Sequence, residues 1–203
     1  MGRLDKSLVI YLNHPLFFLL PSGKIIEKNE YNMERREYKM KILGISCSPR
    51  KRGNTVILLE ETLRGAAELG ADIELFSVSG KDIRGCDSCY ACFQKGECRI
   101  QDDMQPLYTK LIEADGIVFG SPIYTYSITA QAKAIVDRIF ALNQKSKTLA
   151  NKVGGVIVVA GSLGLIDALK DYYFFFALQK MLPANFVAAY ATMKGDAKRL
   201  SKG

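Results

Sequence analysis

KILGISCSPRKRGNTVILLEETLRGAAEL, residues 41–69, contains the pattern that decides the fold. Its first seven residues, Lys41–Cys47, are short and β-rich and predict a strand, and a polar loop, Ser48–Gly53, follows. Residues Asn54–Leu69 then predict a helix that stops at Gly70, because apolar side chains recur on one face at Val56, Leu59, Leu63 and Ala67.

The same alternation of strand and helix continues to the end of the chain. Four more segments predict strands: Ala71–Val78, Asp115–Gly120, Val153–Ala160 and Asn185–Thr192. Three more predict helices: Asp102–Ala114, Ile128–Leu142 and Leu165–Met181. The run VGGVIVVA at 153–160 is apolar throughout, as expected for a central strand covered on both faces. The order predicts an α/β protein with a doubly wound, five-stranded parallel sheet and right-handed crossovers.

Composition limits the possible classes of protein. The chain has 203 residues, 48% of them hydrophobic and 24% charged, which fits one soluble globular domain. The net charge of +7 is scattered and comes with no nucleic-acid recognition motif, so we expect no nucleic-acid partner. An acidic electron carrier or a phosphorylated cofactor accounts for the charge more simply. The only histidine is His14, so the sequence argues against catalysis by histidine.

The first 39 residues differ from the rest. Their apolar stretch, Leu8–Leu20, is too short and too interrupted to span a bilayer, and no clean cleavage site follows it. We expect residues 1–39 to be a disordered extension or to precede the true start at Met40; an ordered arm and a signal peptide are the alternatives. Residues 40–203 would then form a single cytoplasmic domain with no membrane segment.

Three predicted loops lie at the carboxyl ends of strands, where open parallel sheets bind ligands. The first, residues 46–55, leads into a helix N-terminus, which accepts phosphate readily. Ordinary helix capping is the alternative for this loop. The second, GSPIYTYS at 120–127, offers a proline turn and two tyrosines to a flat ring, and the third, AGSLG at 160–164, is rich in glycine. Together they predict a phosphate subsite and a planar-ring subsite on one rim.

Four of the five cysteines form the motif C-x2-C-x2-C-x5-C, at Cys86, Cys89, Cys92 and Cys98. Structural zinc sites usually combine two separated C-x2-C pairs, whereas a compact triplet is typical of [4Fe–4S] sites. A cluster, a zinc ion and a motif that binds nothing all remain open. The fifth, Cys47, ends a predicted strand and is expected to be a small core residue.

The segments SCSPRKRGNT (46–55) and ADGIVFGSPIYTYSITAQAKAIVDR (114–138) resemble the NADPH-dependent FMN reductase family, over roughly Met40 to Thr192. The resemblance implies a flavodoxin-like fold with FMN at the strand ends. It places the phosphate at Ser48, Arg50, Asn54 and Thr55, with Gly53 allowing close approach. It places the isoalloxazine along Pro122, Ile123 and Tyr124, with Gly161 and Ser162 on the other side.

The cysteine segment is similar to that of the iron–sulfur flavoproteins, a branch of the same family. This implies a loop, residues 86–98, inserted after the second strand to hold one [4Fe–4S] cluster, electrons from ferredoxin, and a homodimer or homotetramer. The alternative is an NAD(P)H-dependent FMN or quinone reductase with structural or vestigial cysteines, and a third possibility is a cofactor-free interaction module. The family normally has a further helix after the last strand, which Gly195–Gly203 is too short and polar to replace.

Overall fold

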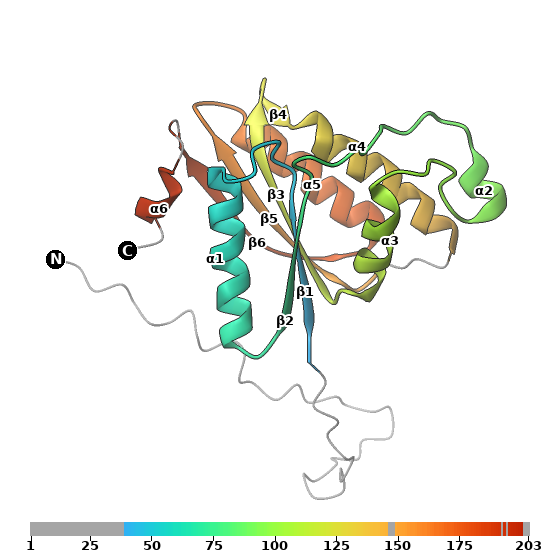
Figure 1. The fold of residues 1–203 in the computed structure, drawn as a ribbon, viewed down its shortest axis with the longest axis horizontal. Helices are drawn as coiled ribbons and strands as arrows, with labels where there is room; N and C mark the ends of the chain where they lie inside the picture. Colours follow the sequence, from blue (N-terminus) through green and yellow to red (C-terminus); the bar gives the residue numbers. More distant parts are fainter. Residues whose placement is uncertain (1–38, 146–148, 192, 194, 201–203) are drawn as a thin grey trace, which may run out of the picture. The chain divides into compact units, whose positions relative to one another are not determined.

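The computed structural model describes residues 39–145, 149–191, 193 and 195–200 (Figure 1). The predicted extension, residues 1–39, lies outside this part of the chain except for Lys39, which forms an ion pair with Asp72. The domain boundary at Met40 therefore stays a prediction. No helix in the described part of the chain is long and apolar enough to cross a membrane.

Five parallel strands form the sheet, in the spatial order β2-β1-β3-β5-β6, and β4 pairs antiparallel with the end of β3. This confirms the predicted doubly wound α/β sheet. In register, Ser46 lies beside Gly120 and Gly120 beside Ile157, so the ends of the central strands meet at one edge. The strands are β1 (Lys41–Ser46), β2 (Asp72–Ser77), β3 (Gly116–Tyr124), β4 (Ser127–Ile128), β5 (Val153–Ala160) and β6 (Leu182–Tyr190).

The helices follow the predicted order, with one short addition inside the cysteine loop, α2, and another after the last strand, α6. They are α1 (Asn54–Glu68), α2 (Ala91–Lys95), α3 (Met104–Glu113), α4 (Ala130–Ile139), the 3₁₀ helix η2 (Phe140–Lys145), α5 (Leu165–Gln179) and α6 (Ala197–Leu200).

Side chains of β5 alternate between two cores, one on each face of the sheet. Val156 and Val158 pack into a large core with buried residues of α3, α4 and α5. Ile157 and Val159 pack on the opposite face with α1 and α6. Because successive strand residues point to opposite faces, a strand buried on both sides must be apolar at every position. This is why 153–160 contains no polar residue.

β3 is longer than predicted. We expected the strand to end at Gly120 and a loop to follow, but pairing continues to Pro122, which lies beside Val159. The strand then forms a hairpin with β4 that projects beyond the sheet edge (Figure 1), and Thr125 and Tyr126 make its turn with φ of 48° and 68°. Glycine and proline usually signal a turn, and here pairing with β5 overrides that signal.

Other boundaries shift for identifiable reasons. The last strand begins at Leu182, three residues earlier than expected, because Pro183 is tolerated in an edge strand. The helix expected from Ile128 begins at Ala130, because the Thr129 side chain accepts the Ala132 N–H and so caps it.

Candidate functional site

The three predicted ligand loops lie at the carboxyl ends of β1, β3 and β5, which are neighbours in the sheet. From β1 the chain first goes to β2 on one side and later returns as β3 on the other side. The point where strand order reverses therefore lies between β1 and β3. This is the usual ligand position in an open parallel sheet.

The N-terminus of α1 is free to receive an anion. Its N-cap residue is Gly53, so no side chain accepts a hydrogen bond from the N–H groups of the first turn, and that turn contains no acidic residue. The unpaired backbone N–H groups and the positive end of the helix dipole therefore face the loop at the end of β1. Ser48 and Thr55 are buried beside this turn, and Arg50 is exposed. The Ser48 hydroxyl accepts the Arg50 N–H at 3.2 Å, which folds the loop back on itself.

Asn54 has a structural role that the sequence did not suggest. Its side-chain N–H₂ donates to the Met193 carbonyl at 2.9 Å, and its side-chain oxygen accepts the N–H groups of Gly195 and Ala197. The amide thus ties the start of α1 to the segment that follows β6. A phosphate contact from this side chain stays a prediction, and it would compete with these bonds.

The second and third loops contact one another directly. Gly164 has a φ of 91°, and a Cβ added there would lie 2.6 Å from the Tyr126 Cα atom. The Ser127 hydroxyl also donates to the Asp171 carboxylate at 2.8 Å, which links the hairpin to α5. The tip of the β3–β4 hairpin therefore lies against the glycine loop. Tyr124 on this hairpin is exposed, as are Gly161 and Ser162 in the loop.

Thr129 joins the bases of the first two loops, a role that sequence reasoning missed. Its hydroxyl donates to the Cys47 carbonyl at 2.8 Å, and its N–H donates to the Ser121 hydroxyl at 3.2 Å. All three residues are buried. The available signal was a threonine, a preferred N-cap residue, as the second residue of the predicted helix Ile128–Leu142. The structure thus brings the candidate residues of β1 and β3 together, and their contacts with a cofactor remain predictions.

All four motif cysteines line one small pocket, between the cysteine loop and the C-terminal end of α4. Each is a free thiol. Burial raises the pKa of Cys92, and negative charge on its three companion cysteines raises it further, which reflects how near they lie. The loop is shaped by left-handed backbone at Ser88 and Tyr90, and the Phe93 ring anchors it at 5.6 Å from that of Phe140.

The cysteine sulfurs share the pocket without converging on one point. Among the described residues, no three side chains of the metal-binding types are placed to hold a single ion. A zinc ion lies about 2.3 Å from each sulfur, so its ligands must be within about 4 Å of one another. A four-iron cluster spreads its cysteine ligands further apart than a single ion does.

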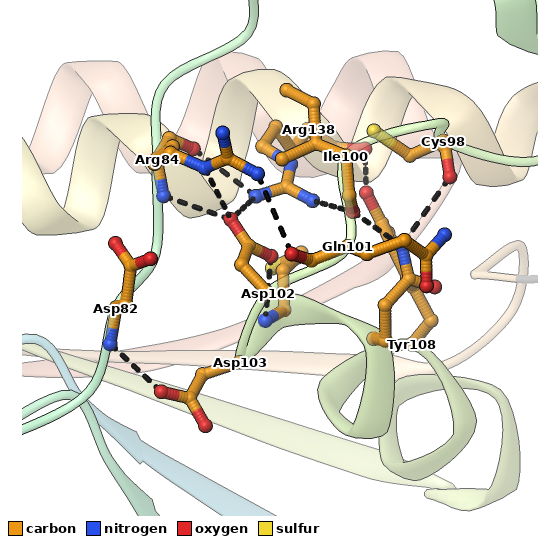
Figure 2. Close-up of polar contacts among 11 residues, drawn as sticks. Asp82, Arg84, Cys98, Ile100, Gln101, Asp102, Asp103, Tyr108 and Arg138 are labelled. Carbon is orange, nitrogen blue, oxygen red and sulfur yellow. Dashed lines mark hydrogen bonds and ion pairs between the residues drawn. The ribbon is translucent and has the colours of Figure 1, made fainter.

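Arg138, which also lines this pocket, forms an ion pair with Asp102, and both side chains are fully buried. Figure 2 shows the pair. Neither residue was predicted as part of the site. Arg138 comes three residues after the buried Ile135 and four before the buried Leu142, so helical spacing alone puts it on the core-facing side of α4. A charged residue at a core-facing position of a helix indicates a buried ionic contact, and this was the signal in the sequence that could have found Arg138.

Comparisons with known proteins identify the family of the chain. A model of the NADPH-dependent FMN reductase family matches residues 40–193. An iron–sulfur flavoprotein of Methanocaldococcus jannaschii is 39% identical over 145 residues, covering 70% of this chain and 75% of that protein. One from Archaeoglobus fulgidus is 38% identical over 147 residues, covering 71% and 75%.

The solved NAD(P)H:quinone oxidoreductase of Methanothermobacter marburgensis has a similar fold, with a TM-score of 0.62 at 13% identity over 81% of this chain and 94% of that one. That likeness shows the flavodoxin-like fold alone. The family match covers the strands, the three loops and the cysteine segment described above. The chain therefore belongs to the NADPH-dependent FMN reductase family, in its iron–sulfur flavoprotein branch, and is an FMN-dependent oxidoreductase.

Proposed function

We propose that the protein transfers electrons from ferredoxin through a [4Fe–4S] cluster to FMN. The observation that carries the proposal is the pocket lined by Cys86, Cys89, Cys92 and Cys98, all free thiols. A domain with a large hydrophobic core does not need disulfide bonds for its stability, so stability does not explain four cysteines in a loop of thirteen residues. Thiolates are the ligands that iron–sulfur clusters require.

The FMN phosphate would bind at the N-terminus of α1. The uncapped first turn after Gly53 supplies backbone donors, and the buried hydroxyls of Ser48 and Thr55 lie beside it. Arg50 adds positive charge from the exposed part of the loop. Asn54 would contribute its backbone N–H, since its side chain is engaged with residues 193–197.

The isoalloxazine would lie along the end of β3. Pro122 and Ile123 there are held by pairing with β5 and β4, and the exposed Tyr124 follows them. Gly161 and Ser162 would close the other side, because their loop lies against the hairpin at Gly164. The pairing of Pro122 with β5 and of Ile123 with β4 would hold this edge of the site in one position and exclude water from the face of the ring that meets the sheet.

When bound, FMN exchanges one or two electrons and a [4Fe–4S] cluster exchanges one, so the pair couples a one-electron donor to a two-electron acceptor. The chain's part is to position both groups and to set their potentials through burial and hydrogen bonds. We assign no acid or base residue. A net charge of +7 suits an acidic donor such as ferredoxin, which it would attract over a distance at low salt.

The alternative is an NAD(P)H-dependent FMN or quinone reductase with structural or vestigial cysteines. One observation favours it: no three described side chains are placed to hold a single ion as they stand. In that case nicotinamide would reduce FMN directly, and the cysteine loop would have no part in turnover.

Anaerobic stopped-flow reduction separates the two functions. We expect reduced ferredoxin to bleach the flavin faster than NADPH does, and the Cys89→Ala variant to lose the ferredoxin reaction. The Cys47→Ala variant, which removes the cysteine outside the pocket, should keep it. Rapid bleaching by NADPH, with ferredoxin inert and Cys89→Ala unaffected, would establish the alternative.

A further inference from the structure

A buried ion pair is hydrogen-bonded to the residues on either side of the cysteine loop. The side chains of Arg138, from α4, and Asp102, two residues before α3, are both fully buried and hydrogen-bonded to each other. A buried guanidinium is costly unless its charge and its donors are satisfied. The Tyr108 hydroxyl donates to the Arg138 carbonyl at 3.0 Å, which fixes the backbone of the arginine as well.

This pair holds both ends of the cysteine loop. One terminal nitrogen of Arg138 donates to the Arg84 carbonyl and the other to the Ile100 carbonyl, each at 3.1 Å. The Arg84 N–H in turn donates to the Asp102 carboxylate at 3.0 Å. Arg84 precedes the first motif cysteine by two residues and Ile100 follows the last by two. Figure 2 shows the guanidinium joined to both ends.

One nitrogen atom of the guanidinium, Nε, has no hydrogen-bond partner among the described residues. The Nε–H of Arg138 is buried and, within the described residues, meets no acceptor. A buried donor left unpaired costs stability, so its retention needs an explanation. Arg138 also lines the same pocket as the four cysteines. A bound cluster would bring into that pocket the acceptors it now lacks, namely thiolate sulfur and inorganic sulfide.

We propose that Arg138 is a positioning residue for the iron–sulfur site, an inference that rests on the proposed function. Its terminal nitrogens, with Asp102, fix the two ends of the cysteine loop, and its Nε–H donates to a sulfur of the bound cluster. Hydrogen bonds to cluster sulfurs and nearby positive charge favour the reduced form, which carries one more negative charge. Arg138 therefore raises the reduction potential of the cluster.

The test compares three variants with the wild-type protein, all loaded with FMN and reconstituted with iron and sulfide without oxygen. The double variant Arg138→Met with Asp102→Asn removes both charges together, so no unpaired charge stays buried, and it keeps an acceptor for the Met104 N–H. Arg138→Lys keeps the charge and loses the Nε–H. Lys133→Met is the matched control, because Lys133 is an exposed cation on the same helix.

Two readouts are taken: hydrogen exchange of residues 84–100, and the midpoint potential of the cluster in a redox titration. In the double variant we expect exchange at least tenfold faster and a tenfold shift toward the oxidised cluster, which is about 59 mV for one electron. Arg138→Lys should lower the potential in the same direction, and Lys133→Met should change neither readout. Bound FMN verifies that each variant is folded.

A wild-type chain without iron and sulfide would overturn the proposed function, and this inference with it. A wild-type cluster beside a double variant with unchanged exchange or unchanged potential would overturn this inference alone. If the double variant binds no FMN, Arg138→Lys decides: a wild-type potential in that variant overturns the role of the Nε–H.

Discussion

Gly120 sits where α1 crosses β3, and it has no room for a side chain. An added Cβ would lie 2.5 Å from a methyl carbon of Leu59 and 2.9 Å from the methyl of Thr55. Gly120→Ala should therefore lower the free energy of unfolding by about 1–3 kcal/mol, the usual cost of overpacking. It should also weaken FMN binding, because Thr55 belongs to the first turn of α1.

The matched control for this substitution is Gly65→Ala. Gly65 lies within α1 and a Cβ there would meet nothing within 4 Å. Alanine should stabilise this position by about 0.5–1 kcal/mol, because it restricts the unfolded chain and favours helix. Urea unfolding with and without FMN measures both effects. A Gly120→Ala protein as stable as wild type would contradict the close packing of α1 on β3.

Cys47 should not react with thiol reagents in the native protein. It is fully buried, and burial raises the pKa of its thiol to about 12. The folded thiol therefore stays protonated up to high pH, whereas the unfolded thiol ionises near its ordinary value of 9.0. We expect a thiol reagent at pH 9 to modify the four motif cysteines of metal-free protein and to reach Cys47 only in denaturant.

The same pKa shift sets a pH dependence. The contribution of Cys47 to stability is fully present below pH 9 and is lost as the pH rises toward 12, because only the unfolded state gains the charge. Reaction of Cys47 in the native protein at the rate of the motif cysteines would contradict its burial.

Single residues show what a sequence can and cannot indicate about this site. Cys47 was predicted as a core residue and the prediction is confirmed, because position at a strand end already implied burial. Asn54 was predicted from its type alone, and its side chain proves to bind residues 193–197, which lie far away in the sequence. Arg138 was missed, since its three partners come from two segments, at residue 84 and at residues 100–102, that only the fold brings together around it.

At the scale of elements, the junction between α1 and the segment after β6 can be tested through Asn54. Asn54→Asp keeps the oxygen that accepts from Gly195 and Ala197 but loses the donation to Met193. It also places a negative charge at the N-terminus of α1, where the phosphate would bind. We expect a modest loss of stability, about 1 kcal/mol for one hydrogen bond, and a larger loss of FMN affinity.

Asn54→Ala separates the two effects. Without the side chain, all three hydrogen bonds to residues 193–197 are lost but no charge is added. Stability should fall further than in Asn54→Asp, while FMN affinity should fall less. Thermal unfolding and flavin titration provide the two measurements. Equal losses of FMN affinity in the two variants would instead assign the Asn54 side chain to the phosphate.

Elements were predicted well where burial alone dictates the pattern. β5 was placed without error, because a strand covered on both faces must be apolar throughout. The ends of β3 and β6 were misplaced, because Pro122 and Pro183 signal breaks that pairing with β5 overrides. The short helix in the cysteine loop has no buried residue and so no periodic pattern to predict it.

At the scale of the whole molecule, we expect a homodimer or homotetramer. The edge strand β6 has apolar residues that the described part of the chain leaves exposed, among them Leu182 and Val187. Such edges and patches favour association. Val187→Lys should shift the protein toward a monomer in light scattering, whereas Ile73→Lys should not. Ile73 is equally exposed, at 44%, on the opposite edge strand β2. A monomeric wild type would contradict the expectation.

If the proposed function is right, one chain holds both FMN and an iron–sulfur cluster. The most direct test is an ultraviolet–visible spectrum of protein purified without oxygen, with iron, sulfide and zinc measured on the same sample. We predict flavin bands over a broad brown absorbance, with about four iron and four sulfide per chain, and loss of the brown absorbance and the iron in Cys89→Ala but not in Cys47→Ala. A clean yellow spectrum without iron would contradict the presence of a cluster and leave a simple FMN reductase.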